Sequence, residues 1–143
     1  MTNVLLPIEE GRDASPSIGH VIELARREPV RVYLLNVRTP LPSYVARFIP
    51  AAQRRAFHQE NGMRAMREAI ARLDEAGVAH REEVRVGNKA ETIMEFAREM
   101  FCAEIVLGAS DNGLLAGLGL GSIGGQLHHL LHPGEALRIR EAA

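Results

Sequence analysis

Residues 104–122 read EIVLGASDNGLLAGLGLGS: a short apolar run leads into a glycine-rich segment that ends at Ser122. The almost wholly apolar run at residues 104–107 predicts a central strand that is buried on both faces. Ser122 stands where a helix should begin. A buried strand, a glycine-rich loop and a helix N-terminus together favour phosphate binding, because the loop exposes backbone N–H groups and the helix start carries partial positive charge.

Helix and strand patterns alternate on the amino-terminal side of this stretch and continue after it. Strands are expected at residues 3–8, 30–37, 78–86, 104–107 and 135–140. Helices are expected from an N-cap at Ser15 to Pro29, over an arginine-rich segment that ends at Gly77, after an N-cap at Asn88, and from Ser122 to His132. An irregular, proline-rich connector joins the second strand to the arginine-rich helix. The third strand is the most charged, so we expect it at an edge of the sheet. This order predicts an α/β fold, with a single doubly wound parallel five-stranded sheet and helices on both faces.

The composition is that of an ordinary globular protein. The chain has 143 residues, 46% hydrophobic and 24% charged, and we expect residues 1–143 to form a single domain. A formal net charge of −1 exerts no global attraction on nucleic acid or on anionic membranes. The apolar stretches are too short and glycine-rich to span a bilayer, the N-terminus lacks a signal-peptide pattern, and the single Cys102 cannot form an internal disulfide. We therefore expect a cytoplasmic protein without nucleic-acid or membrane partners.

Several enzyme classes are disfavoured by their missing motifs. Ser110 begins like a G-x-S-x-G nucleophile elbow, but Asn112 occupies the closing glycine position. The sequence contains no G-x-x-x-x-G-K-[ST] phosphate loop, and Ser122 stands where a dinucleotide fingerprint needs its third glycine. His128 and His132 lie four apart on one helix face, but without an H-E-x-x-H motif we interpret them as helix-end histidines and expect no metal site. The arginines of the long helix are interpreted as a solvated face.

Two short stretches at strand ends and one longer pattern carry a family resemblance. The first expected strand ends in Pro7-Ile8-Glu9, and the second ends in Asn36-Val37. In the universal stress protein family, of the UspA type, Pro-Val-Asp and typically His-Val stand at these two places. The segment from Gly87 to Ile93 matches the family pattern Gly-x-x-x-(D/E)-x-I. The chain resembles this family over nearly its whole length.

The glycine-rich stretch also resembles the family's nucleotide loop, in which Gly, two residues, Gly, nine residues, Gly and then Ser or Thr follow the fourth strand. Gly108, Gly121 and Ser122 fall on their places without insertion or deletion. Asp111 occupies the place of the second glycine, so the G-2x-G-9x-G-S loop is degenerate.

The resemblance implies an adenine nucleotide alpha hydrolase-like fold with strand order 3-2-1-4-5. It further implies that ATP or AMP binds at the ends of strands one, two and four, and that the protein is a homodimer with a signalling role. If Asp111 shares a cation with the phosphates, the expected bridging ion is Mg²⁺ or Mn²⁺. We expect at most slow ATP hydrolysis, because no positioned general base or arginine finger can be identified in the sequence. The implied nucleotide-binding residues are Pro7, Ile8, Glu9, Val37, Leu107, Gly108, Ala109, Ser110, Asp111, Gly121, Ser122 and Ile123.

Asp111 leaves two hypotheses open. A carboxylate about 4 Å from a phosphate charge, at an effective dielectric constant near 20, costs roughly 4 kcal/mol. Binding survives if Asp111 points outward or shares a divalent cation with the phosphates. Alternatively, Asp111 blocks the phosphate site, and the protein is a nucleotide-free dimer that serves as a protein-interaction module with an unknown partner. Residues 133–140, PGEALRIR, alternate apolar and basic side chains as a solvated or partner-facing edge does.

Overall fold

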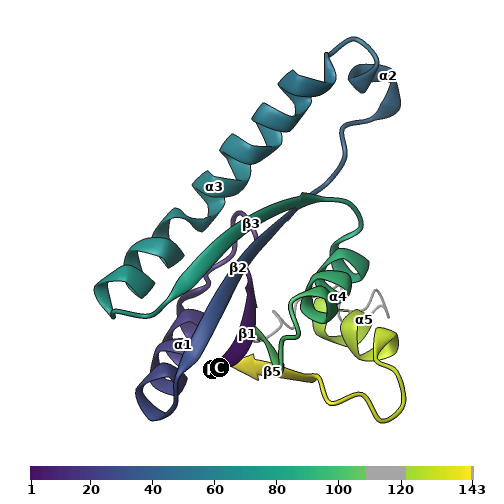
Figure 1. The fold of residues 1–143 in the computed structure, drawn as a ribbon. Coiled ribbons are helices and arrows are strands. Elements are labelled where there is room, and N and C mark those ends of the chain that lie inside the picture. Colours follow the sequence, from purple (N-terminus) through teal and green to yellow (C-terminus); the bar gives the residue numbers. More distant parts are fainter. Residues whose placement is uncertain (109–121, 143) are drawn as a thin grey trace.

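The computed structural model describes residues 1–108 and 122–142 (Figure 1). The strands are β1 (Thr2–Pro7), β2 (Val30–Arg38), β3 (His80–Val86), β4 (Glu104–Gly108) and β5 (Arg138–Ala142). The helices are α1 (Ser15–Arg27), α2 (Ser43–Ala46), α3 (Ala51–Glu75), α4 (Lys89–Glu99) and α5 (Ile123–Leu130). None of the helices in these ranges is long and apolar enough to cross a membrane.

The strands form one parallel sheet in the order β3-β2-β1-β4-β5. This confirms the predicted α/β class, the doubly wound sheet and the strand order. β3 lies at an edge, as its charged sequence predicts, and none of its residues is buried. The apolar β4 lies inside the sheet between β1 and β5.

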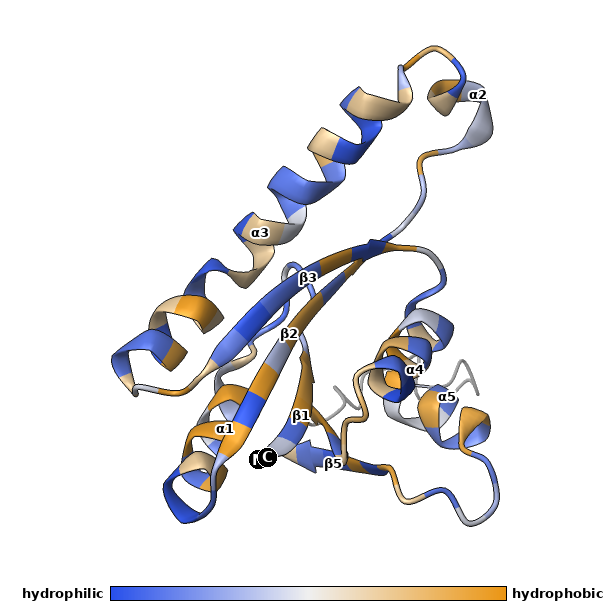
Figure 2. Cartoon of the chain, viewed as in Figure 1, coloured by the Kyte–Doolittle hydropathy of each residue, from blue (hydrophilic) through white to orange (hydrophobic). Residues whose placement is uncertain are grey.

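Successive residues of the inner strands point to opposite faces, which gives the sheet two cores. Val4 and Leu6 pack on the face covered by α1 and α3, whereas Leu5 and Ile105 pack on the face covered by α4 and α5. Figure 2 shows the result: the inner strands are largely hydrophobic, and the outer side of α3 is mostly hydrophilic. Because both faces are covered, the polar ends of the strands are the part of the sheet that remains open to a ligand.

Two of the three predicted helix caps are confirmed. The Asn88 side chain accepts a hydrogen bond from the Glu91 N–H at 3.1 Å, and Ser122 Oγ accepts one from the Gly125 N–H at 3.1 Å. The predicted cap at Ser15 is wrong, because Ser15 is already the first helical residue and Ala14 holds the N-cap position. The Asp13 carboxylate instead accepts a hydrogen bond from the Ser15 N–H at 3.0 Å. This N–H belongs to the first turn of α1 and has no partner within the helix, so the carboxylate two residues upstream satisfies it.

Two other segments differ from the expectation. The connector after β2 contains the short helix α2, whose four residues are too few to show a helical period in the sequence. In the second segment, the last strand begins at Arg138, whereas the sequence predicted a start at residue 135. Glu135 is held in a turn, because its carboxylate pairs with Arg98 Nε at 2.8 Å and accepts the His132 N–H at 2.9 Å. These two contacts hold the pKa of Glu135 at about 2.

We predict that Gly62→Ala lowers the free energy of unfolding by about 1–2 kcal/mol, although alanine is the better helix former. Gly62 lies in α3 against the edge strand β3, and an added Cβ would stand 2.5 Å and 2.6 Å from the two methyl carbons of Val84. Gly19 in α1 is the matched control, since a Cβ there meets nothing within 4 Å. Gly19→Ala should stabilise the protein by about 0.5–1 kcal/mol. Urea denaturation measures both changes, and equal effects at the two glycines would contradict the packing argument.

Candidate functional site

The carboxyl ends of the parallel strands meet at one edge of the sheet. The chain proceeds from β1 outward to β2 and β3, and then returns to the other side of β1 to form β4 and β5, so the strand order reverses between β1 and β4. Ligands of such sheets bind beyond the strand ends next to this reversal. The Ile8 N–H donates to the Leu35 carbonyl at 2.8 Å, which continues the pairing of β1 and β2 up to this edge.

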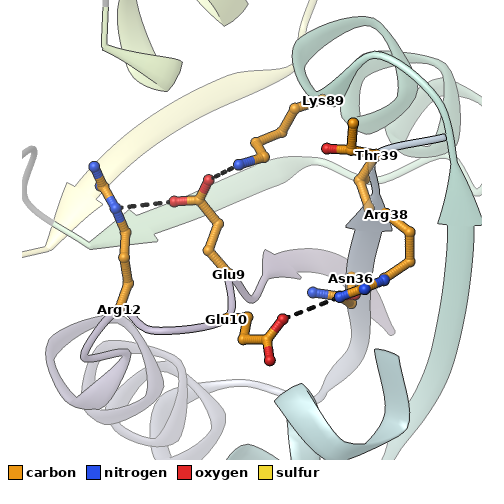
Figure 3. A pocket seen from close by; sticks show the side chains of 8 residues that line it. Glu9, Glu10, Arg12, Asn36, Arg38, Thr39 and Lys89 are labelled. Atoms are coloured by element: carbon orange, nitrogen blue, oxygen red, sulfur yellow. Dashed lines mark hydrogen bonds and ion pairs between the residues drawn. The ribbon is translucent and has the colours of Figure 1, made fainter. Parts of the chain in front are cut away.

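A pocket of about 520 Å³ opens at this edge, and its size falls within the usual range for small-molecule sites (Figure 3). Its walls come from the segment after β1, the end of β2 and the start of α4. The lining residues are Glu9, Glu10, Arg12, Asn36, Val37, Arg38, Thr39 and Lys89. Three of these side chains are cationic and two are carboxylates, so the pocket carries one net positive charge.

Glu9 is the centre of the charge arrangement. Its two carboxylate oxygens are bound by different cations: Oε1 by the ammonium of Lys89, and Oε2 by Arg12 Nε at 3.1 Å. Figure 3 shows Lys89 and Arg12 approaching the carboxylate from opposite sides. Glu10 forms a second pair with Arg38, with 3.1 Å between Oε2 and Nη1.

Two polar atoms behind these pairs are buried without a partner among the residues that the structure describes. Asn36 is 3% exposed, and its Nδ2 donates to the Ile8 carbonyl at 2.8 Å, while its Oδ1 makes no hydrogen bond there. Arg38 Nε is the second such atom. One unused acceptor and one unused donor therefore lie in the wall of the pocket.

The structure brings some of the predicted site residues together. Glu9 and Val37 line the pocket, whereas Ile8 is 4% exposed and belongs to the core under it. Pro7 ends β1, Leu107 and Gly108 end β4, and Ser122 caps α5, which begins at Ile123. The predictions for Ala109, Ser110, Asp111 and Gly121 lie outside the described residues.

Sequence reasoning missed the cations of the pocket. Lys89 is the only lysine in the chain and follows the N-cap of α4, and Arg12 stands three residues after Glu9. Those two facts are the only sequence features that could have drawn attention to them. Nothing in the local pattern shows that Lys89, 80 residues from Glu9, shares this carboxylate with Arg12.

Two other candidates make no site in the described part of the chain. Within residues 1–108 and 122–142, no three His, Cys, Asp or Glu side chains come together as metal ligands. Cys102 is buried, and its burial raises the pKa of the thiol to about 12, which keeps the group protonated and unreactive at neutral pH.

Solved structures with the same fold include three that cover almost the whole chain. The protein MJ0577 is 18% identical, with 99% of this chain and 96% of that chain covered and a TM-score of 0.74. A universal stress protein in complex with cAMP is 18% identical, with 99% and 98% covered and a TM-score of 0.67. A universal stress protein from Archaeoglobus fulgidus in complex with dAMP is 16% identical, with 100% and 98% covered and a TM-score of 0.65.

Sequence comparison places the chain in one family. No curated protein sequence matches it. The sequence profile of the Universal stress protein family matches residues 1–131, which is most of the chain. The strand order, the pocket at the strand ends and this match agree, and the chain belongs to the universal stress protein family.

Proposed function

We propose that this protein is a stress-response module that binds an adenine nucleotide, ATP or AMP, at the ends of β1, β2 and β4. The observation that carries the proposal is the pocket of about 520 Å³ at the strand ends, with the carboxylate of Glu9 in its wall. Two relatives of the same fold were solved in complex with cAMP and dAMP, which supports an adenine nucleotide as the ligand.

Each part of the nucleotide has a counterpart in this arrangement. Glu9 accepts hydrogen bonds from the ribose hydroxyls, and the end of β2 at Val37 lies beside the base. The start of α5, capped by Ser122, supplies partial positive charge to the 5′-phosphates. A Mg²⁺ or Mn²⁺ ion would neutralise phosphate charge next to Asp111. We propose a regulatory output, because the charged side chains that line the pocket pair with each other and form no nucleophile–base pair.

A nucleotide-free interaction module is the second candidate, in the form of a homodimer in the cytoplasm. The observation that favours it is the engagement of both Glu9 oxygens by Lys89 and Arg12, because a ribose must compete for them. Asp111 favours it as well, through its repulsion of phosphate.

Calorimetric titration with AMP and ATP, each with and without Mg²⁺ or Mn²⁺, separates the two candidates. We expect binding heat for the first candidate, and binding only with the cation would assign a metal-sharing role to Asp111. No heat under any condition would overturn nucleotide binding.

We predict that Glu9 and the ribose hydroxyls are energetically coupled. The wild-type protein should bind 2′,3′-dideoxy-AMP about tenfold more weakly than AMP, because a charged hydrogen bond is lost. Glu9→Gln should reduce this difference to within about twofold. Glu23→Gln is the matched control, because Glu23 pairs with Arg26 on the exposed end of α1 and should keep the wild-type difference. An unchanged difference in Glu9→Gln would show that the ribose is bound elsewhere.

A further inference from the structure

The cations of the pocket retain hydrogen-bond donors that the described residues do not use. Lys89 Nζ has three N–H donors, and Glu9 Oε1 is its partner among the described residues. Arg12 uses its Nε on Glu9, so the rest of its donor fork is available, and Arg38 Nε is buried without a partner in the described part of the chain. Asn36 Oδ1 and the second oxygen of Glu10 are acceptors of the same pocket for which the described residues provide no partner.

The cations are also more accessible than the carboxylate that they bind. The Glu9 side chain is 24% exposed, whereas Lys89 is 40% exposed and Arg12 is 60% exposed. The two cations flank Glu9, as Figure 3 shows, and are the more solvent-accessible partners of both ion pairs. A ligand that meets this part of the pocket meets ammonium and guanidinium groups before it meets the carboxylate.

A neutral ribose leaves one positive charge of this surface uncompensated. Its hydroxyls carry no charge, and both oxygens of Glu9 are already paired with cations, so a hydroxyl shares the carboxylate with them. A phosphate monoester instead brings three acceptor oxygens and a charge of about −1.5 to −2, which suits paired Lys and Arg donors. Lys89 is also the first residue of α4, an eleven-residue helix, and the partial positive charge of its N-terminus favours an anion at the same place.

This charged surface is separate from the place proposed for the 5′-phosphates. Those phosphates are assigned to the start of α5, and neither Ser122 nor Ile123 is among the residues that line the pocket. Lys89 and Arg12 lie next to Glu9, which is the residue assigned to the ribose hydroxyls. A phosphate at the cations would thus be attached to the ribose at its 2′ or 3′ oxygen.

We propose that the ribose end of the pocket binds a second phosphate, so that the preferred ligand is an adenosine phosphorylated at both the 5′ and the 2′ or 3′ positions. This rests on the proposed adenine-nucleotide binding. Lys89 and Arg12 are the specificity-determining residues, and the added phosphate accepts hydrogen bonds from the donors that they do not use on Glu9. Glu9 holds the two cations apart and in position.

Calorimetry on the full-length protein with AMP, adenosine 2′,5′-bisphosphate, adenosine 3′,5′-bisphosphate and inorganic phosphate tests this proposal. At about 50 mM salt, we expect one of the two bisphosphates to bind about tenfold more tightly than AMP. Raising the salt to about 300 mM should reduce this difference in affinity, because the ions screen the added phosphate charge. The ratio of the AMP and bisphosphate dissociation constants is the readout, since it cancels effects on base and 5′-phosphate binding.

Lys89→Met should lower this ratio to within about twofold, because it removes the ammonium and keeps the side-chain length. Arg26→Met is the matched control: Arg26 also pairs with a glutamate, but on the last turn of α1, and its variant should keep the wild-type ratio. Thermal melting of each variant checks that the fold is intact.

The outcomes separate the two proposals. If AMP binds and the wild-type ratio is near one, or if Lys89→Met keeps the wild-type ratio, the second phosphate site is wrong and the nucleotide site stands. If inorganic phosphate alone binds as tightly as the bisphosphate, the cations form a general anion site and the proposal is overturned. If neither AMP nor a bisphosphate binds, both proposals fail.

Discussion

Phe96→Ala should lower the free energy of unfolding by about 3–5 kcal/mol, the usual cost of removing a buried aromatic side chain. Phe96 is 1% exposed and belongs to the core between the sheet and α4. Its ring packs edge-on against Tyr33 of β2, with 5.7 Å between centroids, and the guanidinium of Arg85 lies 5.0 Å from its centroid. Truncation leaves a cavity and removes both ring contacts together. Urea denaturation with fluorescence or circular dichroism detection measures the loss.

Phe101, five residues later, is the matched control for this prediction. It is 86% exposed, so Phe101→Ala should change the free energy of unfolding by no more than about 0.5 kcal/mol. Phe96→Leu should fall between the two alanine variants, because leucine fills part of the cavity. A loss below about 1 kcal/mol in Phe96→Ala would mean that α4 does not pack on the sheet as described.

Asp111→Gly should tighten ATP binding by about one to three decades in the absence of a divalent cation. The expectation follows from the repulsion of roughly 4 kcal/mol between a carboxylate and a phosphate charge about 4 Å apart. Glycine would also complete the G-2x-G-9x-G-S pattern that the sequence resembles, and it has no Cβ to hinder a close approach of backbone to phosphate. Titration of ATP by calorimetry in low salt measures the effect.

Two further variants separate charge from backbone in this prediction. Asp111→Asn removes the charge and keeps the side chain, so it should produce most of the gain if repulsion dominates. Asn112→Gly adds a glycine to the same loop without changing the charge, and it should leave the affinity near the wild-type value. An unchanged affinity in Asp111→Gly would mean that Asp111 points away from the phosphates. Weaker binding of Mg²⁺-ATP would mean that the carboxylate shares the cation.

Much of the fold could be predicted from local patterns. The apolar run in β4 predicts an inner strand, and the charged β3 predicts an edge, because burial on both faces excludes unpaired charge. The caps at Asn88 and Ser122 could be predicted because a cap is made by residues three positions apart. The start of β5 could not, since it depends on Arg98, 37 residues before Glu135, which holds that carboxylate in a turn.

The site could be predicted only in part. The ends of the parallel strands mark its position, so Glu9 and Val37 were expected there. The cations around Glu9 were not, because long side chains reach several ångströms from their own backbone and their partners are set by packing. Arg38 illustrates this: it ends β2, and its guanidinium reaches Glu10 after β1.

The sequence by itself determined the kinds of element, their order and the edge of the sheet at which a ligand is expected, because periodicity, caps and apolar runs act between neighbours in the chain. Only the tertiary structure decided the charge of the pocket. Lys89 and Glu9 are 80 residues apart, and they meet because the parallel sheet brings the segment after β1 and the start of α4 to one edge. Glu9, the residue expected to bind the ribose, is therefore paired with a cation. This pairing adds positive charge to the pocket beside the carboxylate.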